Sequence, residues 1–296
     1  MAPELPTLQG RVVAAFSRQH LVELPGGELL PCLTRGKKSL VACGDFVWLR
    51  RTADNQAVIE EIAPRKTLLH RSDAYREKLI AANVSQIIVV VAAEPSFDDE
   101  LLARCLVAAH DQRLETLIVL NKCDLAARAD AARAQLAPYR NIGYRVLELS
   151  ANKDAAPLLP FLQGHTSVLV GQSGMGKSTL INALLPEARA ATTEISVALD
   201  SGKHTTTHAR LYHVNEDSHL IDCPGVQAFG LHHLAYGEIE EGFVEFAAYR
   251  GLCRFRNCRH THEPGCALRE AAGAGKIDPR RLMLLQSISA SVATRK

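Results

Sequence analysis

The stretch that decides the fold runs from Gly171 to Ser178 and reads GQSGMGKS. It matches the pattern G-x-x-x-x-G-K-[ST], whose backbone N–H groups wrap a phosphate. An apolar run at 168–170 precedes it and a helix-like segment at 178–185 follows, which is the context that the motif requires. Lys177 would neutralise the β- and γ-phosphates, and Ser178 would ligate Mg²⁺. The residues expected to contact the phosphates are Gly171, Gln172, Ser173, Gly174, Met175, Gly176, Lys177, Ser178 and Thr179.

A second short motif, Asn121-Lys122-Cys123-Asp124, follows the apolar run 117–120. Guanine presents two donors on one edge, and a carboxylate accepts both, whereas adenine would leave that carboxylate unpaired. We expect Asp124 to accept these donors, Asn121 to approach the other edge and the Lys122 stem to cover the base. Together with the P-loop, this motif predicts a GTP-binding protein that uses Mg²⁺.

Three further elements complete the predicted site. Ser150-Ala151-Asn152 ends another strand-like run and should contact the base through its backbone. Asp222 follows the run 219–221 and would hold Mg²⁺ through water, while the Gly225 N–H could bond the γ-phosphate. One threonine of the segment GKHTTT should contact Mg²⁺ in the GTP state, and Thr206 is the favoured one.

The order of these motifs differs from that of Ras-like GTPases, which begin with the phosphate loop. Here the guanine loop comes first, so the sequence predicts a circularly permuted domain, an arrangement tolerated where the original termini lie close together. Strand-like runs alternate with helix-like stretches such as 99–110, which predicts a parallel sheet covered by helices.

The residue that positions the attacking water is not obvious. Ras has a glutamine directly after its Asp-x-x-Gly motif, but this chain has Val226 there. His204 in the first switch is the preferred candidate, and Gln227 is one place too late but not excluded. We therefore expect slow intrinsic turnover that a partner stimulates.

The segment 1–66 predicts a small barrel. Five short β-rich runs are separated by turn residues, and they cover 11–17, 20–24, 28–34, 45–51 and 56–62. An OB-fold and an SH3-like barrel both fit this pattern. We expect residues 1–66 to form an RNA-binding domain, the GTPase domain to occupy 67–231 and a third, mostly helical domain to occupy 232–296. The third domain should have helices near 267–272 and 279–292.

The third domain carries a cluster of metal-ligating residues, Cys253, Cys258, His260 and Cys266. Three thiolates and an imidazole form a known tetrahedral zinc set, and four protein ligands make the metal structural. His262 is a rival for the imidazole position. The cluster would gather Arg250, Arg254, Arg256 and Arg259 on one surface, an arrangement that suits phosphate contacts.

Charge and composition agree with a nucleic-acid partner. The net charge is +2, yet residues 250–296 hold 10 Lys/Arg against 3 Asp/Glu, a formal +7. The first residues lack the basic start and apolar run of a signal peptide, and no apolar stretch is long enough for a membrane span. We therefore expect a cytoplasmic monomer whose thiols stay reduced.

Taken together, the chain resembles the ribosome small subunit-dependent GTPase A family of bacteria. The likeness covers essentially the whole chain and is most specific in G-x-HTTT at 202–207 and C-x-F-x-NC-x-H-x-x-EPGC at 253–266. It implies an OB-fold, a permuted GTPase and a zinc domain in which His260 is the imidazole ligand. It also implies a late assembly factor of the 30S subunit that binds 16S rRNA and hydrolyses GTP when docked.

Departures from the family are small, and two other functions compete. Cys223 stands where threonine is usual, Met175 replaces a commoner valine, and the N-terminus lacks a basic extension. One alternative is an RNA-binding protein that uses GTP as a structural ligand, which stimulated turnover would contradict. The other is a metabolic P-loop kinase, which leaves Asp124, the permuted order and the metal cluster unexplained.

Overall fold

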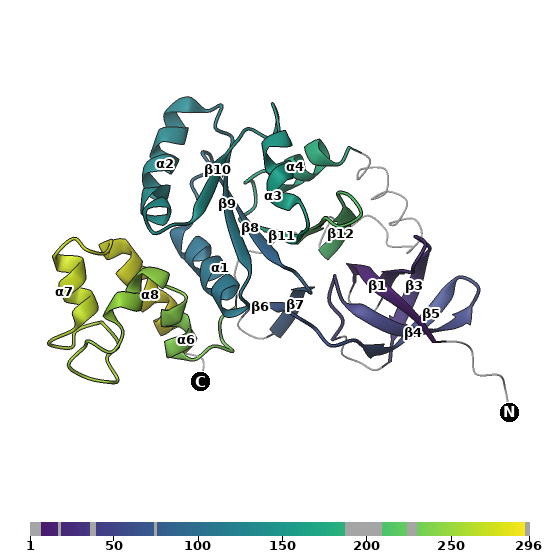
Figure 1. The fold of residues 1–296 in the computed structure, drawn as a ribbon, viewed down its shortest axis with the longest axis horizontal. Helices are drawn as coiled ribbons and strands as arrows, with labels where there is room; N and C mark the ends of the chain where they lie inside the picture. The colour runs from purple at the N-terminus through teal and green to yellow at the C-terminus, as the bar shows by residue number, and fades with distance from the viewer. Residues whose placement is uncertain are drawn as a thin grey trace.

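The computed structural model describes residues 7–16, 19–35, 40–73, 76–186, 209–223 and 230–293. Figure 1 shows a β-barrel at one end of the molecule, an α/β region in the middle and a small helical region at the other end. In these ranges no helix has the length and apolar character needed to cross a membrane.

The N-terminal strands form a closed barrel in the order β1-β2-β3-β5-β4, with β4 pairing back onto β1. The strands are β1 (Thr7–Ala15), β2 (Gln19–Glu23), β3 (Leu29–Thr34), β4 (Phe46–Ala53) and β5 (Gln56–Ile62). All neighbouring pairs are antiparallel except β3 with β5. Alternate side chains, such as Val47 and Leu49, fill the barrel. This five-stranded Greek-key arrangement is OB-like, which confirms the predicted barrel.

The central sheet continues from the barrel in the order β10-β9-β8-β11-β13-β12. Its strands are β8 (Gln86–Ala92), β9 (Glu115–Asn121), β10 (Arg145–Glu148), β11 (Thr166–Val170), β12 (Ala209–His213) and β13 (His219–Asp222). All of them run parallel except β12, which is antiparallel to β13. Every residue of β8 is buried, as expected for a strand covered on both faces.

Helices cover both faces of the sheet, as the alternating pattern predicted. Figure 1 shows α1 (Asp99–Asp111) and α2 (Ala126–Asn141) on one side, and α3 (Leu159–Leu162) and α4 (Lys177–Leu184) on the other. A short 3-10 helix, η1 (Ala156–Leu158), leads into α3. α1 begins at Asp98, whose carboxylate accepts the Glu100 N–H at 2.8 Å and so caps the helix.

Two connections between the barrel and the central sheet were not predicted. A hairpin of β6 (Leu68–Asp73) and β7 (Arg76–Ala82) lies between β5 and β8 in the chain. In addition, β12 pairs with β1, with Ala14 opposite Arg210. This pairing covers an edge that would otherwise expose backbone groups, and it joins barrel and sheet into one continuous hydrogen-bonded sheet.

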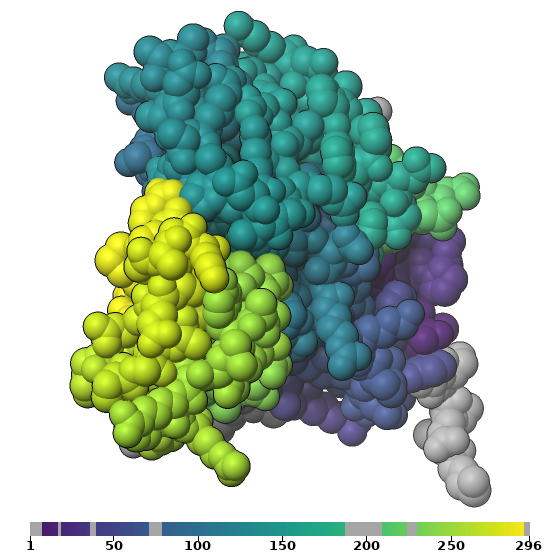
Figure 2. Space-filling model, turned by 60° about the vertical axis from the view of Figure 1, so that its left-hand side comes forward, coloured from purple at the N-terminus to yellow at the C-terminus, as the bar shows by residue number. Residues whose placement is uncertain are grey.

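The C-terminal region packs against the GTPase helices. It contains α6 (Tyr236–Glu241), the 3-10 helix η2 (Val244–Tyr249), α7 (Ala267–Gly273) and α8 (Pro279–Ala293), so both predicted helices are present. Figure 2 shows this region resting directly on the α/β body. The contact includes Arg281, which is 2% exposed, pairs with Glu245 at 2.6 Å and lies against the rings of Tyr139 and Phe243.

Candidate nucleotide and metal sites

The predicted phosphate loop lies between β11 and α4, and its glycines have conformations that other residues rarely adopt. Gly171, Gly174 and Gly176 all have positive φ angles. A Cβ atom on Gly171 would lie 2.2 Å from the Val90 carbonyl oxygen, and one on Gly176 would lie 2.3 Å from Asn121 Nδ2. The loop can therefore pack this closely against β8 and the guanine loop because these positions lack side chains.

Two opposite charges face the loop. The Lys177 ammonium is buried and donates hydrogen bonds to the carbonyls of Gly171 at 2.6 Å and Gln172 at 2.8 Å. Burial lowers the pKa of Lys177, while nearby Asp222 acts in the opposite direction. Asp222 ends β13, and burial raises the pKa of its carboxyl group. The ammonium is thus held inside the loop, where phosphate oxygens would be recognised.

Asn121 joins three loops around the predicted base pocket. It is 2% exposed, and its Nδ2 donates to the Met175 carbonyl at 2.9 Å. Its Oδ1 accepts the N–H groups of Lys122 at 2.8 Å and Ala151 at 2.9 Å. The approach of Asn121 to the base stays a prediction; within the protein its amide oxygen is shared by these two backbone donors. In the structure it links the phosphate loop, the guanine loop and the 150–152 loop.

The remaining residues of the guanine loop surround a small pocket. The Asp124 N–H donates to Ser150 Oγ at 2.9 Å, which ties the guanine loop to the next strand end. Lys122 has a φ of 61°, and its ammonium donates to the Glu94 carbonyl at 2.8 Å. The pocket is lined by Asn121, Lys122, Asp124, Ala151, Asn152, Gly176 and Thr179. Residues from three separate motifs therefore meet at one opening.

Sequence reasoning missed the loop that follows β8. The Asp98 N–H donates to Gln172 Oε1 at 3.0 Å, and Pro95 is the nearest neighbour of a Cβ built on Gly174. Glu94 receives the Lys122 contact described above. No motif marks this loop, but its position at the carboxyl end of β8, beside β11, places it against the phosphate loop.

Some predicted site residues lie outside the described ranges. These are the catalytic candidate His204, the magnesium candidate Thr206 and the switch residue Gly225, together with Val226 and Gln227. Their predicted roles remain predictions. Ser173 and Ser178, on the phosphate loop and at the start of α4, are within the described part of the chain.

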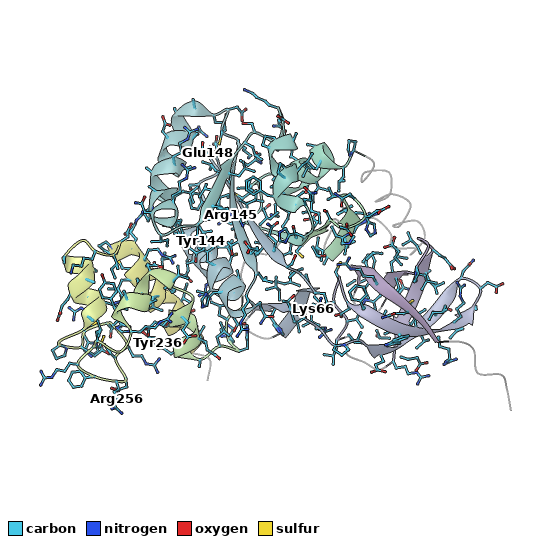
Figure 3. All side chains as sticks on the ribbon, viewed as in Figure 1. Lys66, Tyr144, Arg145, Glu148, Tyr236 and Arg256 are labelled. Carbon is cyan, nitrogen blue, oxygen red and sulfur yellow. The ribbon has the colours of Figure 1, made fainter. Side chains whose placement is uncertain are left out.

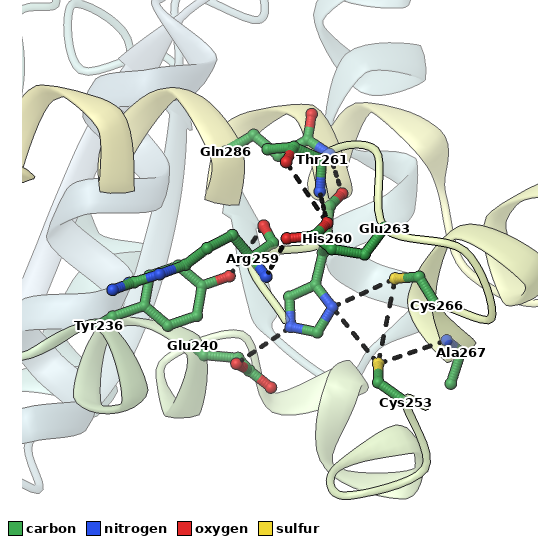
Figure 4. A network of polar contacts seen from close by, with 10 residues as sticks. All are labelled: Tyr236, Glu240, Cys253, Arg259, His260, Thr261, Glu263, Cys266, Ala267 and Gln286. Atoms are coloured by element: carbon green, nitrogen blue, oxygen red, sulfur yellow. Dashed lines mark hydrogen bonds and ion pairs between the residues drawn. The ribbon is translucent and has the colours of Figure 1, made fainter. Parts of the chain in front are cut away.

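The Cys/His cluster comes together in the C-terminal region, and Figure 4 shows three of its members, Cys253, His260 and Cys266. One ligand atom from each of Cys253, Cys258, His260 and Cys266 lies within 4.8 Å of all the others. His260 Nδ1 is 3.6 Å from Cys253 Sγ and 3.3 Å from Cys266 Sγ, and the two sulfurs are 4.0 Å apart. Tetrahedral zinc with three thiolates and one imidazole implies ligand–ligand separations of roughly 3.5–3.8 Å, and the three distances above lie within about 0.2 Å of these values, so the donor set fits the ion.

Residues around the cluster hold it in this shape. We call residues 250–266 the metal knuckle. His260 has a φ of 59°, and its Nε2 lies 3.2 Å from Glu240 Oε2, which leaves Nδ1 facing the sulfurs. Glu263 accepts the N–H groups of Arg259 at 2.8 Å, Thr261 at 2.9 Å and His262 at 3.1 Å, and these bonds lower its pKa to about 2. His262 is not part of the cluster, and sequence reasoning missed Glu240.

Comparisons with known proteins agree with this geometry. The model of the RsgA GTPase family matches residues 62–232. A small ribosomal subunit biogenesis GTPase RsgA from Nitrosospira multiformis is 54% identical over 98% of this chain and 93% of that protein. One of the same name from Burkholderia pseudomallei is 53% identical over 92% of this chain and 88% of that protein.

Solved structures extend the likeness to the whole fold. YjeQ from Thermotoga maritima superposes with a TM-score of 0.72 at 28% identity, covering 98% of this chain and 100% of that one. YloQ, described as a circularly permuted GTPase, gives 0.70 at 27% identity, covering 100% of this chain and 98% of that one. The permuted order inferred from the motifs is therefore confirmed.

Proposed function

The chain belongs to the RsgA GTPase family, and from this premise we propose that it hydrolyses GTP in the assembly of the small ribosomal subunit. The observation that carries the proposal is the meeting of the guanine loop, the 150–152 loop and the phosphate loop at one pocket. The names of the similar proteins from Nitrosospira and Burkholderia support the ribosomal role.

Each residue of the nucleotide site has a distinct task. Asp124 accepts the two donors of guanine, and Lys177 contacts the β- and γ-phosphates. Ser178, Thr206 and Asp222 would hold Mg²⁺, which would neutralise charge on the phosphates when bound. Asn121 contributes by holding the three loops together. Gly225 donates its N–H to the γ-phosphate.

Water activation is assigned to the first switch. Val226 has no group that can hydrogen-bond water, whereas the imidazole of His204 can do so. The assignment rests on the sequence position of His204 within the switch motif. Turnover is then slow until docking on the subunit brings the imidazole of His204 into position to hold the attacking water.

The knuckle holds one structural Zn²⁺ and presents arginines to 16S rRNA. Four protein donors complete a tetrahedral set, and eight free thiols suit the reducing cytoplasm. Arg250, Arg254, Arg256 and Arg259 surround the cluster, and Figure 3 shows Arg256 at the outer tip of this region. In the described part of the chain none of these guanidinium groups has a carboxylate within ion-pair distance, which suits phosphate contacts.

Steady-state turnover tests the proposal. GTP hydrolysis is measured with purified small subunits, with large subunits and with neither, at moderate salt because phosphate contacts are screened. Small subunits should stimulate hydrolysis strongly and large subunits should not. The Lys177→Ala variant controls for contaminating GTPases. Intact binding to small subunits without stimulation would contradict ribosome-triggered hydrolysis and favour a binding protein for which GTP is a structural ligand.

A further inference from the structure

The side chain of Gln172 joins the phosphate loop to a segment that carries no GTPase motif. Its Oε1 accepts the N–H of Asp98 at 3.0 Å. At the same time, the backbone carbonyl of Gln172 accepts a hydrogen bond from the Lys177 ammonium at 2.8 Å. The phosphate-loop pattern leaves this position open, so the pattern does not account for a glutamine there. One residue therefore contacts both the cation that faces the phosphates and the loop that follows β8.

The N–H group bound by Gln172 belongs to the N-cap residue of α1, Asp98. In a capping box, a Glu or Gln three residues after the N-cap bonds this N–H group from within the helix. In α1 that position is Leu101, whose side chain has no acceptor. Gln172 therefore supplies, from the phosphate loop, the acceptor that a capping box would supply from the helix. The start of α1 is thereby tied to the phosphate loop.

The segment 94–98, which leads into α1, is also anchored to α2. Phe97 is 6% exposed, and its carbonyl accepts a hydrogen bond from Gln135 Nε2 at 3.3 Å. Glu94 forms an ion pair with Arg128. Both partners belong to α2, the helix that follows the guanine loop. The segment therefore lies between the phosphate loop on one side and the helix after the guanine loop on the other.

Lys122 of the guanine loop depends on this segment for its position. Its ammonium donates to the Glu94 carbonyl at 2.8 Å. Lys122 also lines the small pocket that it shares with Asp124. A lysine stem has four flexible methylenes, so a fixed acceptor at its end determines where the stem lies. The first residue of the segment thus holds the side chain expected to cover the base, and its last residue is held by the phosphate loop.

We propose that the segment 94–98 is part of the nucleotide site and that Gln172 is a positioning residue, which holds this segment so that Lys122 covers the guanine base. The inference deepens the proposed function and rests on it for the identity of the nucleotide. Gln172 acts on the base through Lys122 and takes no part in the chemical step. GDP and GTP should therefore lose the same affinity when its side chain is changed, because they share the base.

Nucleotide titrations test the proposal without any hydrolysis. The full-length zinc-loaded protein with Mg²⁺ is titrated with fluorescent GDP and with a fluorescent non-hydrolysable GTP analogue. Gln172→Met keeps the length of the side chain and removes its acceptor, so both nucleotides should bind about three- to tenfold more weakly, as for loss of one hydrogen bond. Gln163→Met is the matched control and should leave both affinities unchanged, because Gln163 is exposed and precedes β11, whereas the phosphate loop follows that strand.

A double-mutant cycle with Lys122→Met separates this role from a direct one at the phosphates. If Gln172 acts through Lys122, Gln172→Met should change the affinity less than about twofold once Lys122→Met is present. Hydrogen exchange of the Asp98 amide measures the contact itself. Exchange should become faster in Gln172→Met and stay close to that of the unchanged protein in Gln172→Glu, which keeps an acceptor oxygen at the same length.

Other results would overturn the proposal. Equal nucleotide affinity of Gln172→Met and the unchanged protein would show that the segment needs no such support. A loss that persists in full beside Lys122→Met would place the role of Gln172 at the phosphates, and a loss for the GTP analogue alone would place it at the γ-phosphate. Thermal melting checks the fold of each variant, and Gln172→Asn, which is one methylene shorter, is the second variant that withdraws the acceptor. A failure of subunit-stimulated turnover is a separate result, because these titrations involve neither hydrolysis nor the subunit.

Discussion

The barrel and the metal knuckle each contain several arginines whose surroundings are described, five in the barrel and four in the knuckle, and they use them differently. In the barrel, four of the five form an ion pair with a carboxylate, namely Arg35, Arg50, Arg51 and Arg65, whereas Arg11 donates to Thr166 Oγ1. In the knuckle, Arg250 donates to the Glu241 carbonyl, Arg254 lies over Phe255 and Arg259 lies over Tyr236. The knuckle arginines thus keep their charge available.

The difference arises from how each region uses its acidic residues. Glu263 is the only acidic residue between 250 and 266. Its carboxylate accepts backbone N–H groups of Arg259, Thr261 and His262, so it shapes the loop and does not neutralise an arginine side chain. A charge count already separates the two ends, because residues 250–296 carry a formal +7 and residues 1–66 a formal +2, and the hydrogen bonds add that the knuckle guanidinium groups stay available for phosphate contacts. Four changes would break or sharpen this comparison.

Removal of the metal should have the largest effect. Structural zinc sites contribute an apparent binding free energy of about 10–16 kcal/mol, and a knuckle without zinc has little other core. Cys258→Ser, or a strong chelator, should unfold the knuckle and abolish binding to the small subunit. The barrel, which has its own apolar core, should stay folded. Peptide-resolved hydrogen exchange measures the protection of the barrel and of the knuckle in one experiment. An equal loss of protection in the barrel would contradict the prediction that the barrel folds independently of the knuckle.

Within the barrel, an ion pair that is buried should matter for stability. Asp45 is fully buried and accepts from Arg65 Nε and NH2, both at 2.7 Å, and from the Ala42 N–H at 2.7 Å. Asp45→Ala leaves those donors unpaired and should lower the free energy of unfolding by about 3–5 kcal/mol. The exposed pair Arg51–Glu28 is the matched control, and Arg51→Ala should cost less than about 1 kcal/mol. Urea denaturation measures both.

A knuckle arginine should behave in the opposite way. Arg256→Ala removes no ion pair in the described structure, so the free energy of unfolding should stay within about 0.5 kcal/mol. If Arg256 contacts one phosphate, the slope of log affinity for the small subunit against log salt should fall by about 0.7–0.9. Arg51→Ala in the barrel should leave the slope unchanged. A similar change of slope for Arg256→Ala and Arg51→Ala would contradict the idea that the knuckle arginines, and not those of the barrel, contact phosphate.

Much of the fold and of the two candidate sites could be predicted from the sequence, because the motifs that define them are local. The phosphate loop, the guanine loop and the cysteine spacing each specify chemistry within a few residues, and β8 is apolar along its length. The predicted barrel, the parallel sheet and the permuted order were accordingly confirmed. His204 and Thr206 lie outside the described residues and stay predictions.

Other features depend on contacts between distant segments and carry no local signal. α2 is rich in alanine and arginine, and only a few of its side chains, such as Leu136 and Tyr139, are buried. The Asn121 bonds to Met175 and Ala151 span 54 and 30 residues of sequence. The same holds for Glu240, which orients His260 from 20 residues away. Sequence patterns find residues that touch a ligand more readily than those that hold them in place.

The smallest expected effect concerns pH and the shape of the knuckle. Hydrogen bonds, first of all from the Arg259 N–H, lower the pKa of Glu263 to about 2 from an ordinary value of 4.5. Because this pKa is lower in the folded state than in the unfolded chain, the ionised carboxylate stabilises the fold. That stabilisation is fully present above pH 4.5 and is lost as pH falls from about 4.5 toward 2. Glu263→Gln imitates the protonated carboxyl group, so it should loosen the 259–262 loop at pH 6 and make little difference near pH 2.

Hydrogen exchange of the Arg259 and Thr261 amides across this range measures the effect. Acid also protonates the thiolate and imidazole ligands, and loss of the metal would unfold the knuckle in both proteins, so the variant and the unchanged protein are compared only at pH values where zinc stays bound. The difference between them should shrink as pH falls. A difference that is constant with pH would show that the glutamine perturbs the loop by its shape and not by its charge. The negative charge of Glu263 would then not be what fixes the shape of the 259–262 loop.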